Sequence, residues 1–485
     1  MRRANTIIFV TDNHARFAAG CYGARAARTP AIDSLAARGV RFDNAYSASP
    51  LCCPARAALA SGRYPHQTGF YDNVLAYDGS VPSWMHRARG AGCKVVSIGK
   101  LHFRSSDDDN GFTEEQIPMH ILNKRGGTAM LLRASGGELQ ATGQWELYTQ
   151  QSGIGSTVYQ QYDRDITRSA IEWLRRQAHA GSGQPWILFV SFASPHPPFR
   201  VPEHIDRMFP LEDMPLPVAF RASERSNHPA IAHLRKIMGT MPMEDETVLR
   251  RVAKAYLGLV NHVDRQIGEI LGEIEGLELG DLRMIYTSDH GEMLGTQGVF
   301  GKSCLLEGAI KVPLIMCGAG IPQGEARSTP VSHVDLFPTL LESAGVAPSP
   351  EDGDIPGTSL FRQLPPDRLL FAEYHATGST GAAFALRRGP YKLIYHVDHP
   401  NELFDLDSDP DETRDLSGRK EYQAVLEELI GCLRAICDPE AVDRDAKRAQ
   451  SEKVAEFGGR EALIGAGTLV YTPPPGKAPE LREIK

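Results

Sequence analysis

A cysteine, a proline and an arginine lie close together in one short stretch of the chain. Cys52 is followed by Pro54 and Arg56, and then by the small, apolar run 57–60. Ala and Leu lose little on entering a helix, so the run predicts a helix with Cys52 at or just before its N-terminus. Unpaired N–H groups favour an anion there, and Arg56 can bind a tetrahedral oxyanion as a fork. The stretch therefore indicates anion chemistry, with a buried packing cysteine as the alternative.

Two polar pairs follow short apolar runs in distant parts of the sequence. Asp12 and Asn13 come after the run 6–10, and Asp289 and His290 come after the run 284–287. Two such pairs at neighbouring strand ends can converge on one cation. Oxygen ligands suit Ca²⁺, Mg²⁺ or Mn²⁺, and an imidazole favours Mn²⁺ or another transition metal. The alternative is a strand-end aspartate that caps the next helix.

Lysine and histidine side chains form a third group of candidates. Lys100 and His102 stand two residues apart beyond an apolar run, so both can face one side. Lys100 would act as a point charge, and His102 can take up a proton near neutral pH. The alternative for His102 is a partly buried histidine with its hydrogen bonds satisfied.

Alternating apolar segments indicate the elements that position these residues. Strands are predicted at 6–10, 40–46, 93–98, 185–193, 284–287 and 312–317, and helices at 29–38, 81–91, 157–178, 244–274 and 334–344. This alternation is typical of an α/β fold with a mostly parallel sheet flanked by helices. Asp12, Lys100, His196 and Asp289 all follow strands, where ligands of open α/β sheets gather.

The pattern changes after about residue 365. Short antiparallel strands are predicted at 369–372, 382–386, 391–395 and 402–406, with a helix at 421–436. We therefore predict a catalytic domain over 1–365, a small α+β domain over 366–438 and a C-terminal arm over 439–485. Residues 105–155 are interpreted as an insertion or cap. The arm would dock on another subunit or over the active-site mouth, with a disordered tail as the alternative.

Composition narrows the class of protein. The chain has 485 residues, of which 42% are hydrophobic and 23% charged, and its net charge is −8. The negative charge argues against general nucleic-acid binding. Eight scattered cysteines form no disulfide framework. No apolar run approaches the roughly 20 residues of a membrane span, and the first run is too short for a signal peptide. We expect a cytoplasmic protein without membrane or nucleic-acid partners.

The stretch around Cys52 resembles the signature of a known family. The string Cys52-Cys53-Pro54-Ala55-Arg56, with 49–50 before it and Gly62 after, is similar to that of the formylglycine-dependent type I sulfatases of the alkaline-phosphatase superfamily. In that family the cysteine is oxidised to formylglycine, whose hydrate is the nucleophile. Only Cys52 has proline at +2 and arginine at +4, so the register selects Cys52 and not Cys53.

The resemblance extends over about residues 5–420 and implies an alkaline-phosphatase-like fold. It also implies one divalent metal ion, Ca²⁺ or Mn²⁺ with Mg²⁺ as a further candidate. Its ligands would be Asp12, Asn13, the modified Cys52, Asp289 and His290. Asn13 and His290 depart from the pairs that most sulfatases carry. Together with 49–52, 71–73 and 99–103, they look like the choline-sulfatase and phosphonate monoester hydrolase branch.

By this resemblance the protein is a hydrolase of sulfate esters of the arylsulfatase type. The residue at 52 would attack sulfur, and Arg56, Lys100, Lys302 and the cation would hold the developing charge. His196 or Lys302 would protonate the leaving alcohol, and His102 would remove the second hydroxyl's proton and so release sulfate. Asn73 would contact the anionic group of the substrate. A formylglycine-generating enzyme is the implied partner, and a homo-oligomer is expected.

Two other functions stay open. The nearer is a phosphonate monoester or phosphodiester hydrolase that uses the same residues. The more distant is a non-catalytic binder of an anion or metal, in which Cys52 stays a thiol. The pocket for the alcohol should come from 105–155, the C-terminal domain and the arm. Trp145 could form part of a cage for a cationic head group there, with packing as its alternative role.

Overall fold

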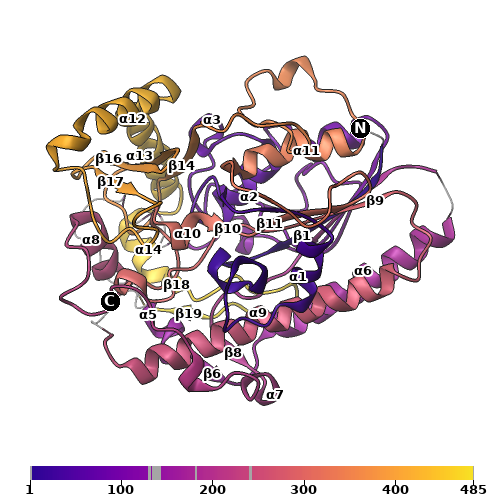
Figure 1. Ribbon diagram of the computed structural model, residues 1–485, viewed down its shortest axis with the longest axis horizontal. Helices are drawn as coiled ribbons and strands as arrows, with labels where there is room; N and C mark the ends of the chain where they lie inside the picture. The colour runs from indigo at the N-terminus through magenta and orange to yellow at the C-terminus, as the bar shows by residue number, and fades with distance from the viewer. Residues whose placement is uncertain are drawn as a thin grey trace.

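An eight-stranded sheet forms the centre of the larger part of the molecule (Figure 1). The computed structural model describes residues 3–128, 131, 133, 144–180, 183–239 and 243–483. The strands lie in the order β12 (Glu325–Arg327), β2 (Gly39–Phe42), β11 (Leu314–Gly318), β9 (Leu282–Ser288), β1 (Asn5–Thr11), β7 (Trp186–Ser191), β4 (Lys94–Lys100) and β5 (Glu114–Met119). All these strands run in one direction except β11, which is antiparallel to both β9 and β2. The predicted mostly parallel sheet is therefore confirmed.

Helices cover both faces of this sheet, as the two faces of β1 show. Ile7 and Phe9 point into a core shared with α1 (Pro30–Ala37), α6 (Val158–Ala180) and α9 (Glu246–Ile274). Ile8 and Val10 point into a core shared with α2 (Cys52–Ser61), α4 (Trp84–Gly90) and α11 (Leu336–Ser343). Burial on both faces explains why the parallel strands have continuous apolar sequences.

The second sheet lies at the left of Figure 1 and is fully antiparallel. It contains β14 (Leu370–Tyr374), β15 (Ala383–Arg388), β16 (Tyr391–His396) and β17 (Glu402–Asp405) in chain order. Helix α12 (Gln423–Ile436) packs on it through Leu429 and Leu433. The predicted smaller α+β unit on an antiparallel sheet is thus present.

The C-terminal stretch contains more regular structure than the sequence indicated. It forms α13 (Pro439–Glu456), α14 (Arg460–Ala466) and a two-stranded pairing of β18 (Thr468–Leu469) with β19 (Leu481–Arg482). Asp438 accepts a hydrogen bond from the backbone of Ala441, so α13 begins with an N-cap. Val454 and Leu463 share a small core with Val74 and Leu131. The alternative of a disordered tail does not describe this structure.

Three expected elements differ in detail. Within the interval 105–155, β5 extends the central sheet, so this interval is not a single cap. The expected strand 40–46 is divided into β2 and β3 (Ala45–Tyr46), and β3 pairs with β10 (Lys311–Val312) and β13 (Val331–Ser332). The expected strand 312–317 is divided into β10 and β11 at Pro313, which has no N–H for a ladder. Most of 129–143 lies outside the described residues.

Shorter elements complete the chain. They are α3 (Pro65–Thr68), α5 (Trp145–Tyr148), β6 (Gly153–Ile154), β8 (Arg200–Val201), α7 (Glu203–Asp206), α8 (Pro229–Met238) and α10 (Glu307–Ile310). Among the described residues, no helix is both long and apolar enough to cross a membrane.

Candidate active site

The carboxyl ends of three parallel strands place polar side chains at one edge of the central sheet. Asp12 and Asn13 follow β1, Lys100 ends β4, and Asp289 and His290 follow β9. All five side chains are buried. Asn13 has a φ of 75°, in the left-handed region that Asn tolerates better than most residues. This bend turns the chain at the strand end, where it meets the other pair.

Four side chains form a compact group of possible metal ligands. One ligand atom each of Asp12, Cys52, Asp289 and His290 lies within 4.8 Å of the others. His290 Nε2 is 3.1 Å from Cys52 Sγ, 3.5 Å from Asp289 Oδ1 and 3.8 Å from Asp12 Oδ1. His290 Nδ1 donates to the carbonyl of Gly291, which directs Nε2 into the group. Burial lowers the pKa of His290 to about 4, so the imidazole is neutral and able to bind a metal.

Asn13 lies beside this group and is held from two sides. Its backbone N–H donates to Asp289 Oδ1 over 3.1 Å, and its Oδ1 lies 3.3 Å from Lys302 Nζ. Its side-chain amide donates to Glu292 Oε2 over 2.7 Å. Glu292, which was not among the predicted site residues, is fully buried and also accepts N–H groups from Leu294 and Gly301.

Arg56 is used differently from the predicted oxyanion fork. Its Nε donates to Asp289 Oδ2 over 2.8 Å, and its Nη1 donates to the carbonyl of Lys100 and to Ser191 Oγ. Its Nη2 lies 3.6 Å from Asp12 Oδ2. Because most of the guanidinium is bound by the protein and only 2% of the residue is exposed, Arg56 links Asp289 to the carboxyl ends of β4 and β7.

The carboxylate of Asp12 lies close to the charged groups of Lys100 and Arg56. Lys100 Nζ forms an ion pair with this carboxylate. Burial alone would raise the pKa of Asp12, but Lys100 first and then His196 and Lys302 hold it well below its usual range. The carboxylate is therefore ionised at neutral pH, as a metal ligand must be.

Six of the predicted residues line one cavity of about 90 Å³: Cys52, Asn73, Lys100, His102, His196 and Lys302. Cys52 is the first residue of α2, with Leu51 at the N-cap. Cys53 instead packs against Ala76 and Ile121, away from the cavity. Its N–H donates to Asn73 Oδ1 over 3.0 Å, so one N–H expected to be free for an anion already has a partner. The structure thus separates the two cysteines as the register of the motif predicted.

The two cavity histidines are neutral near pH 7. Burial is the main cause and lowers the pKa of both histidines well below 6.5. The charge of Lys302 lowers the pKa of His196 further, and the charge of Lys100 does the same for His102. His196 Nδ1 donates to the carbonyl of Pro197 over 2.9 Å. His102 Nε2 shares a 2.8 Å hydrogen bond with the hydroxyl of Thr472. Thr472, from the C-terminal arm, was not predicted as a site residue.

The remaining cavity wall comes from several parts of the chain. Its lining includes Gly127, Gln144, Leu147, Tyr148, Met238, Ser303 and the arm residues 469–472. The arm therefore lies over the cavity of its own chain, one of the two positions expected for it. The lining aromatic residues are Tyr148 and Tyr471, whereas Trp145 lies outside the lining.

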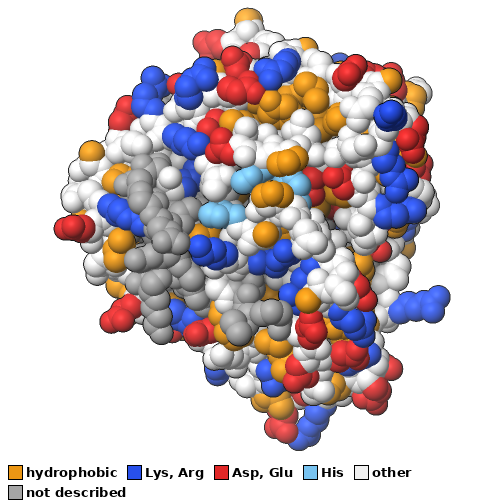
Figure 2. All heavy atoms as spheres, turned by 90° about the vertical axis from the view of Figure 1, so that its left-hand side faces the viewer, with side chains coloured by type: hydrophobic (Ala, Val, Ile, Leu, Met, Phe, Trp, Pro, Cys, Tyr) orange, Lys and Arg blue, Asp and Glu red, His pale blue; other side chains and the backbone are white. Residues whose placement is uncertain are grey.

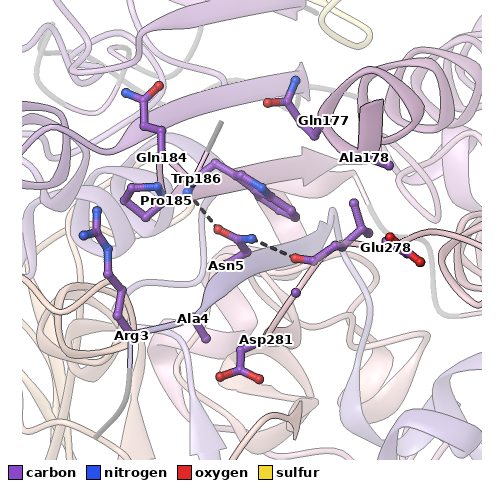
Figure 3. Close-up of a pocket in the computed structure, with 13 residues that line it drawn as sticks. Arg3, Ala4, Asn5, Gln177, Ala178, Gln184, Pro185, Trp186, Glu278 and Asp281 are labelled. Atoms are coloured by element: carbon purple, nitrogen blue, oxygen red, sulfur yellow. Dashed lines mark hydrogen bonds between the residues drawn. The ribbon is translucent and has the colours of Figure 1, made fainter. Parts of the chain in front are cut away.

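A larger cavity, of about 410 Å³, lies at the opposite ends of the strands (Figure 3). There Asn5 donates to the carbonyl of Leu279 and accepts the N–H of Trp186. None of the predicted site residues lines it. Size alone thus does not identify the active site, since the titratable groups gather in the smaller cavity.

Comparison with known proteins agrees with this arrangement. The chain matches the Sulfatase family model over residues 4–346 and the model for the N-sulphoglucosamine sulphohydrolase C-terminal region over residues 295–437. It is 31% identical over 443 residues to a choline-sulfatase of Rhizobium meliloti, covering 87% of this chain and 85% of that protein. It is 26% identical to arylsulfatase K of Danio rerio, covering 90% and 84%.

Solved structures share the fold. The phosphonate monoester hydrolase of Agrobacterium radiobacter superimposes with a TM-score of 0.72 at 24% identity, covering 89% of this chain and 96% of that one. BT4656, solved in complex with its substrate D-glucosamine-2-N,6-O-disulfate, gives a TM-score of 0.70 at 23% identity, covering 92% and 99%. The fold is thus that of the alkaline-phosphatase-like sulfatases.

The fold and the buried ligand group define an α/β protein with a polar site at the carboxyl ends of its strands. The chain belongs to the sulfatase family. Membership supports hydrolysis of sulfate esters as its reaction.

Proposed function

We propose that the chain is a formylglycine-dependent, metal-assisted hydrolase of sulfate esters. The observation that carries the proposal is the meeting of Cys52, at the start of α2, with Asp12, Asp289 and His290 in one buried group. A core cysteine would need none of these polar neighbours, and burying them costs free energy unless they are used or paired.

The unmodified cysteine is a poor nucleophile in this setting. Burial first, and then the nearby Asp12 carboxylate, raises the pKa of Cys52 to about 12. The protein groups alone therefore keep it a neutral thiol near pH 7, whereas the thiolate is the reactive form. Conversion to formylglycine by a generating enzyme removes this obstacle, because an aldehyde hydrate attacks through oxygen.

The ligand group fits one divalent cation. Asp12 and Asp289 supply carboxylates, His290 a neutral imidazole, and Asn13 lies close enough to add an amide oxygen. This mixture suits Mn²⁺ or Ca²⁺, with Mg²⁺ as a weaker candidate. When bound, the ion would supply positive charge beside residue 52 and the oxygens of the ester.

The protonation states of the other cavity residues support a role for each of them in the reaction. Burial, the largest influence, would lower the pKa of Lys302, but its anionic neighbours, which include the carboxylates of Asp12 and Asp289, raise it above its usual range. Lys302 therefore carries a proton at neutral pH and is our candidate donor to the leaving oxygen, with neutral His196 beside it. Neutral His102 can accept the proton that is lost when sulfate departs. Lys100 lines the cavity and offsets the charge that develops on the ester.

We assign a substrate-binding role to Asn73 and a positioning role to Arg56. Asn73 reaches the cavity wall while its carbonyl oxygen caps α2, so it can present its amide N–H groups to the anion. Arg56 holds Asp289 and the end of β4 in place. The predicted direct contact of Arg56 with the substrate is replaced by a positioning role.

A phosphonate monoester or phosphodiester hydrolase is the second candidate. The same cations would hold phosphorus oxyanions, and the similarity in fold to a phosphonate monoester hydrolase is compatible with it. Non-catalytic binding is the third. The predicted homo-oligomer and cytoplasmic location stay predictions.

The test compares initial rates on 4-nitrophenyl sulfate and on a matched phenyl phosphonate monoester. Each is measured with Mn²⁺ and with Ca²⁺, on protein co-expressed with a generating enzyme and checked by intact mass for conversion of Cys52. Higher kcat/KM on the sulfate supports the proposal, and higher kcat/KM on the phosphonate selects the second candidate. Cys52→Ala should reduce both rates to background.

Cys53→Ala is the matched control. Its side chain packs away from the cavity, so conversion at position 52 and turnover should persist. An unconverted thiol at position 52 with no turnover on either substrate would overturn the enzymatic proposal.

A further inference from the structure

A second group of metal-ligand side chains lies where helix α8 meets the β16–β17 hairpin. His228 directly precedes α8, His396 ends β16 and Glu402 begins β17. One ligand atom of each lies within 4.8 Å of the other two. Figure 2 faces the side of the molecule that carries these elements and shows histidine side chains gathered there. None of the three residues has a part in the proposed reaction.

The hairpin fixes two of the three ligands on one face. Ile394 pairs directly with Glu402 across the strands, and His396 lies two residues after Ile394. Since side chains alternate along a strand, His396 and Glu402 point to the same side. His396 Nε2 is 3.0 Å from Glu402 Oε2. The sheet register thus assembles a histidine–carboxylate pair.

The third ligand, His228, comes from the segment that leads into α8. His228 Nε2 donates to the carbonyl of Pro400 over 2.8 Å. Its Nδ1 is then the unprotonated nitrogen, and it lies 3.6 Å from Glu402 Oε2. A histidine whose other N–H is held by a backbone carbonyl is the usual arrangement around a protein metal. Nδ1 also accepts a long, 3.3 Å hydrogen bond from Ala230, which a metal would replace.

Burial and nearby space suit a small ion. The side chains of His228, His396 and Glu402 are 8%, 9% and 3% exposed. A cavity of about 20 Å³ borders His396 and Glu402, which is room for roughly one water molecule. The ring of His399 lies 6.2 Å from that of His228 and 6.3 Å from that of His396. The small cavity leaves room for a water molecule as the fourth ligand, whereas His399 Nε2 is already paired with the hydroxyl of Thr380.

We propose that His228, His396 and Glu402 bind one Zn²⁺ ion at a site separate from the candidate active site. Two imidazoles and one carboxylate with an open fourth position are a common zinc ligand set. Ca²⁺ and Mg²⁺ prefer oxygen ligands, so the two imidazoles of this group disfavour both ions.

The position of the site gives the ion a structural role. It joins α8 to the antiparallel sheet, and α8 ends at Met238, which lines the active-site cavity. Ser303, next to Lys302, borders both that cavity and the small cavity beside His396. The bound ion would therefore hold one wall of the active-site cavity in place.

The experiment counts zinc in full-length protein. Protein stripped with EDTA is loaded with Zn²⁺, passed through gel filtration and analysed for metal. Wild type should retain two equivalents, because Zn²⁺ also enters the strand-end group. Asp289→Asn should keep one, held at the site proposed here. His396→Ala should also keep one, held at the strand ends. This design separates failure of the new site from failure of the catalytic proposal.

A conservative variant guards against misfolding. His228→Asn removes the imidazole but leaves a good N-cap for α8, and it should also lose one equivalent. His120→Ala is the matched control, because His120 forms a similar part-buried pair with Glu115 at 3.2 Å. It should retain both equivalents.

A melting experiment provides a second readout. Ligands that bind only the folded state raise its melting temperature. Zn²⁺ should raise Tm in Asp289→Asn and should fail to do so when His228→Asn is added. Equal zinc content in wild type, His228→Asn and His396→Ala, or no zinc in Asp289→Asn, would overturn the proposal.

Discussion

Asn13 is held between a buried carboxylate and a buried ammonium group. Glu292 accepts its amide N–H, and Lys302 lies on the side of its carbonyl oxygen. These two contacts fix the orientation of the Asn13 amide, so that its oxygen faces Lys302. A carboxylate at Glu292 is required for this, because its other oxygen already accepts backbone N–H groups from Leu294 and Gly301.

Glu292→Gln should weaken metal binding by about 10- to 100-fold with the fold retained, the range typical for groups that orient metal ligands. The glutamine oxygen would stay with the two backbone donors, so its NH₂ would face the NH₂ of Asn13 and force that amide to turn. The measurement is calorimetric titration of metal-free protein with Mn²⁺. Glu115→Gln is the control, because Glu115 also forms a hydrogen bond with a histidine, His120. This variant should bind Mn²⁺ like wild type. Unchanged affinity in Glu292→Gln would exclude this positioning role.

The protonation state of His102 predicts the pH profile. Burial, and then the charge of Lys100, lowers its pKa well below the usual 6.5. As pH falls from about 8 to about 6.5, the folded protein keeps this imidazole neutral and able to accept a proton. Protonation of His102 should therefore begin to lower kcat/KM only at a pH well below 6.5. Melting temperatures at each pH exclude unfolding as the cause. A half-loss of kcat/KM near 6.5, in protein that stays folded, would contradict this assignment.

The sequence predicts the polar site residues at the strand ends, but it does not predict the residues that hydrogen-bond to them and orient them. Asp12, Lys100 and Asp289 follow recognisable apolar strands, so their approach follows from the fold class. Thr472 reaches His102 across 370 positions of sequence, with no local pattern that points to it. Glu292 stands just after the Asp289–His290 pair, but only the structure reveals that it orients Asn13.

Helix α1 is capped by a residue from another helix. Thr29, at its N-cap, makes no capping bond; its hydroxyl donates to Asp33. Asp264 of α9 instead accepts the N–H of Ile32 over 2.8 Å and that of Ala31 over 3.2 Å. The side chain of Asp264 thus satisfies otherwise unpaired donors at this helix end, although burial raises its pKa to about 7. The contact also joins two helices on one face of the sheet.

Asp264→Ala should lower the free energy of unfolding by about 1–2 kcal/mol, the usual cost of losing an N-cap. Asp264→Asn should cost less, because its amide keeps one acceptor. Urea unfolding followed by circular dichroism measures both. Arg265→Ala, at an exposed neighbouring position on α9, is the control and should change little. Equal stability of Asp264→Ala and wild type would show that solvent caps α1 as well.

The sequence predicts where most helices and strands lie. It does not predict the direction of each strand or which strands join the central sheet. Apolar runs located β1, β4, β7 and β9, because parallel strands are buried on both faces. The reversed direction of β11 leaves no mark on such a run. The sequence does not indicate β5, because half of its residues are polar and most are part-exposed at the sheet edge, so the segment resembles a loop.

The whole molecule closes its site with the last part of the chain. Helix α13 packs through Ala446 and Gln450, and Gln450 donates to Asp72, beside Asn73. The chain then crosses the cavity at 469–472, where Tyr159 donates to the carbonyl of Thr472. The sequence indicated an arm but not its helices, because frequent charges hide the narrow apolar face of α13. Only the tertiary contacts identify the surface that this arm covers.

Removal of residues 468–485 should open the cavity while the fold persists. The buried residues of α13 and α14 stay in place, so secondary structure and Tm should change little. Loss of Leu469, Val470 and Tyr471 removes apolar contacts to the alcohol part of the ester, and KM for an aryl ester should rise by about tenfold or more, equivalent to roughly 1.4 kcal/mol. His102 would also lose its partner and gain access to water, so kcat should fall. The control carries Lys477→Ala and Glu480→Ala in the exposed turn between β18 and β19 and should match wild type in both constants. Unchanged KM and kcat in the truncated, folded protein would mean that the arm covers the cavity without contacting the substrate.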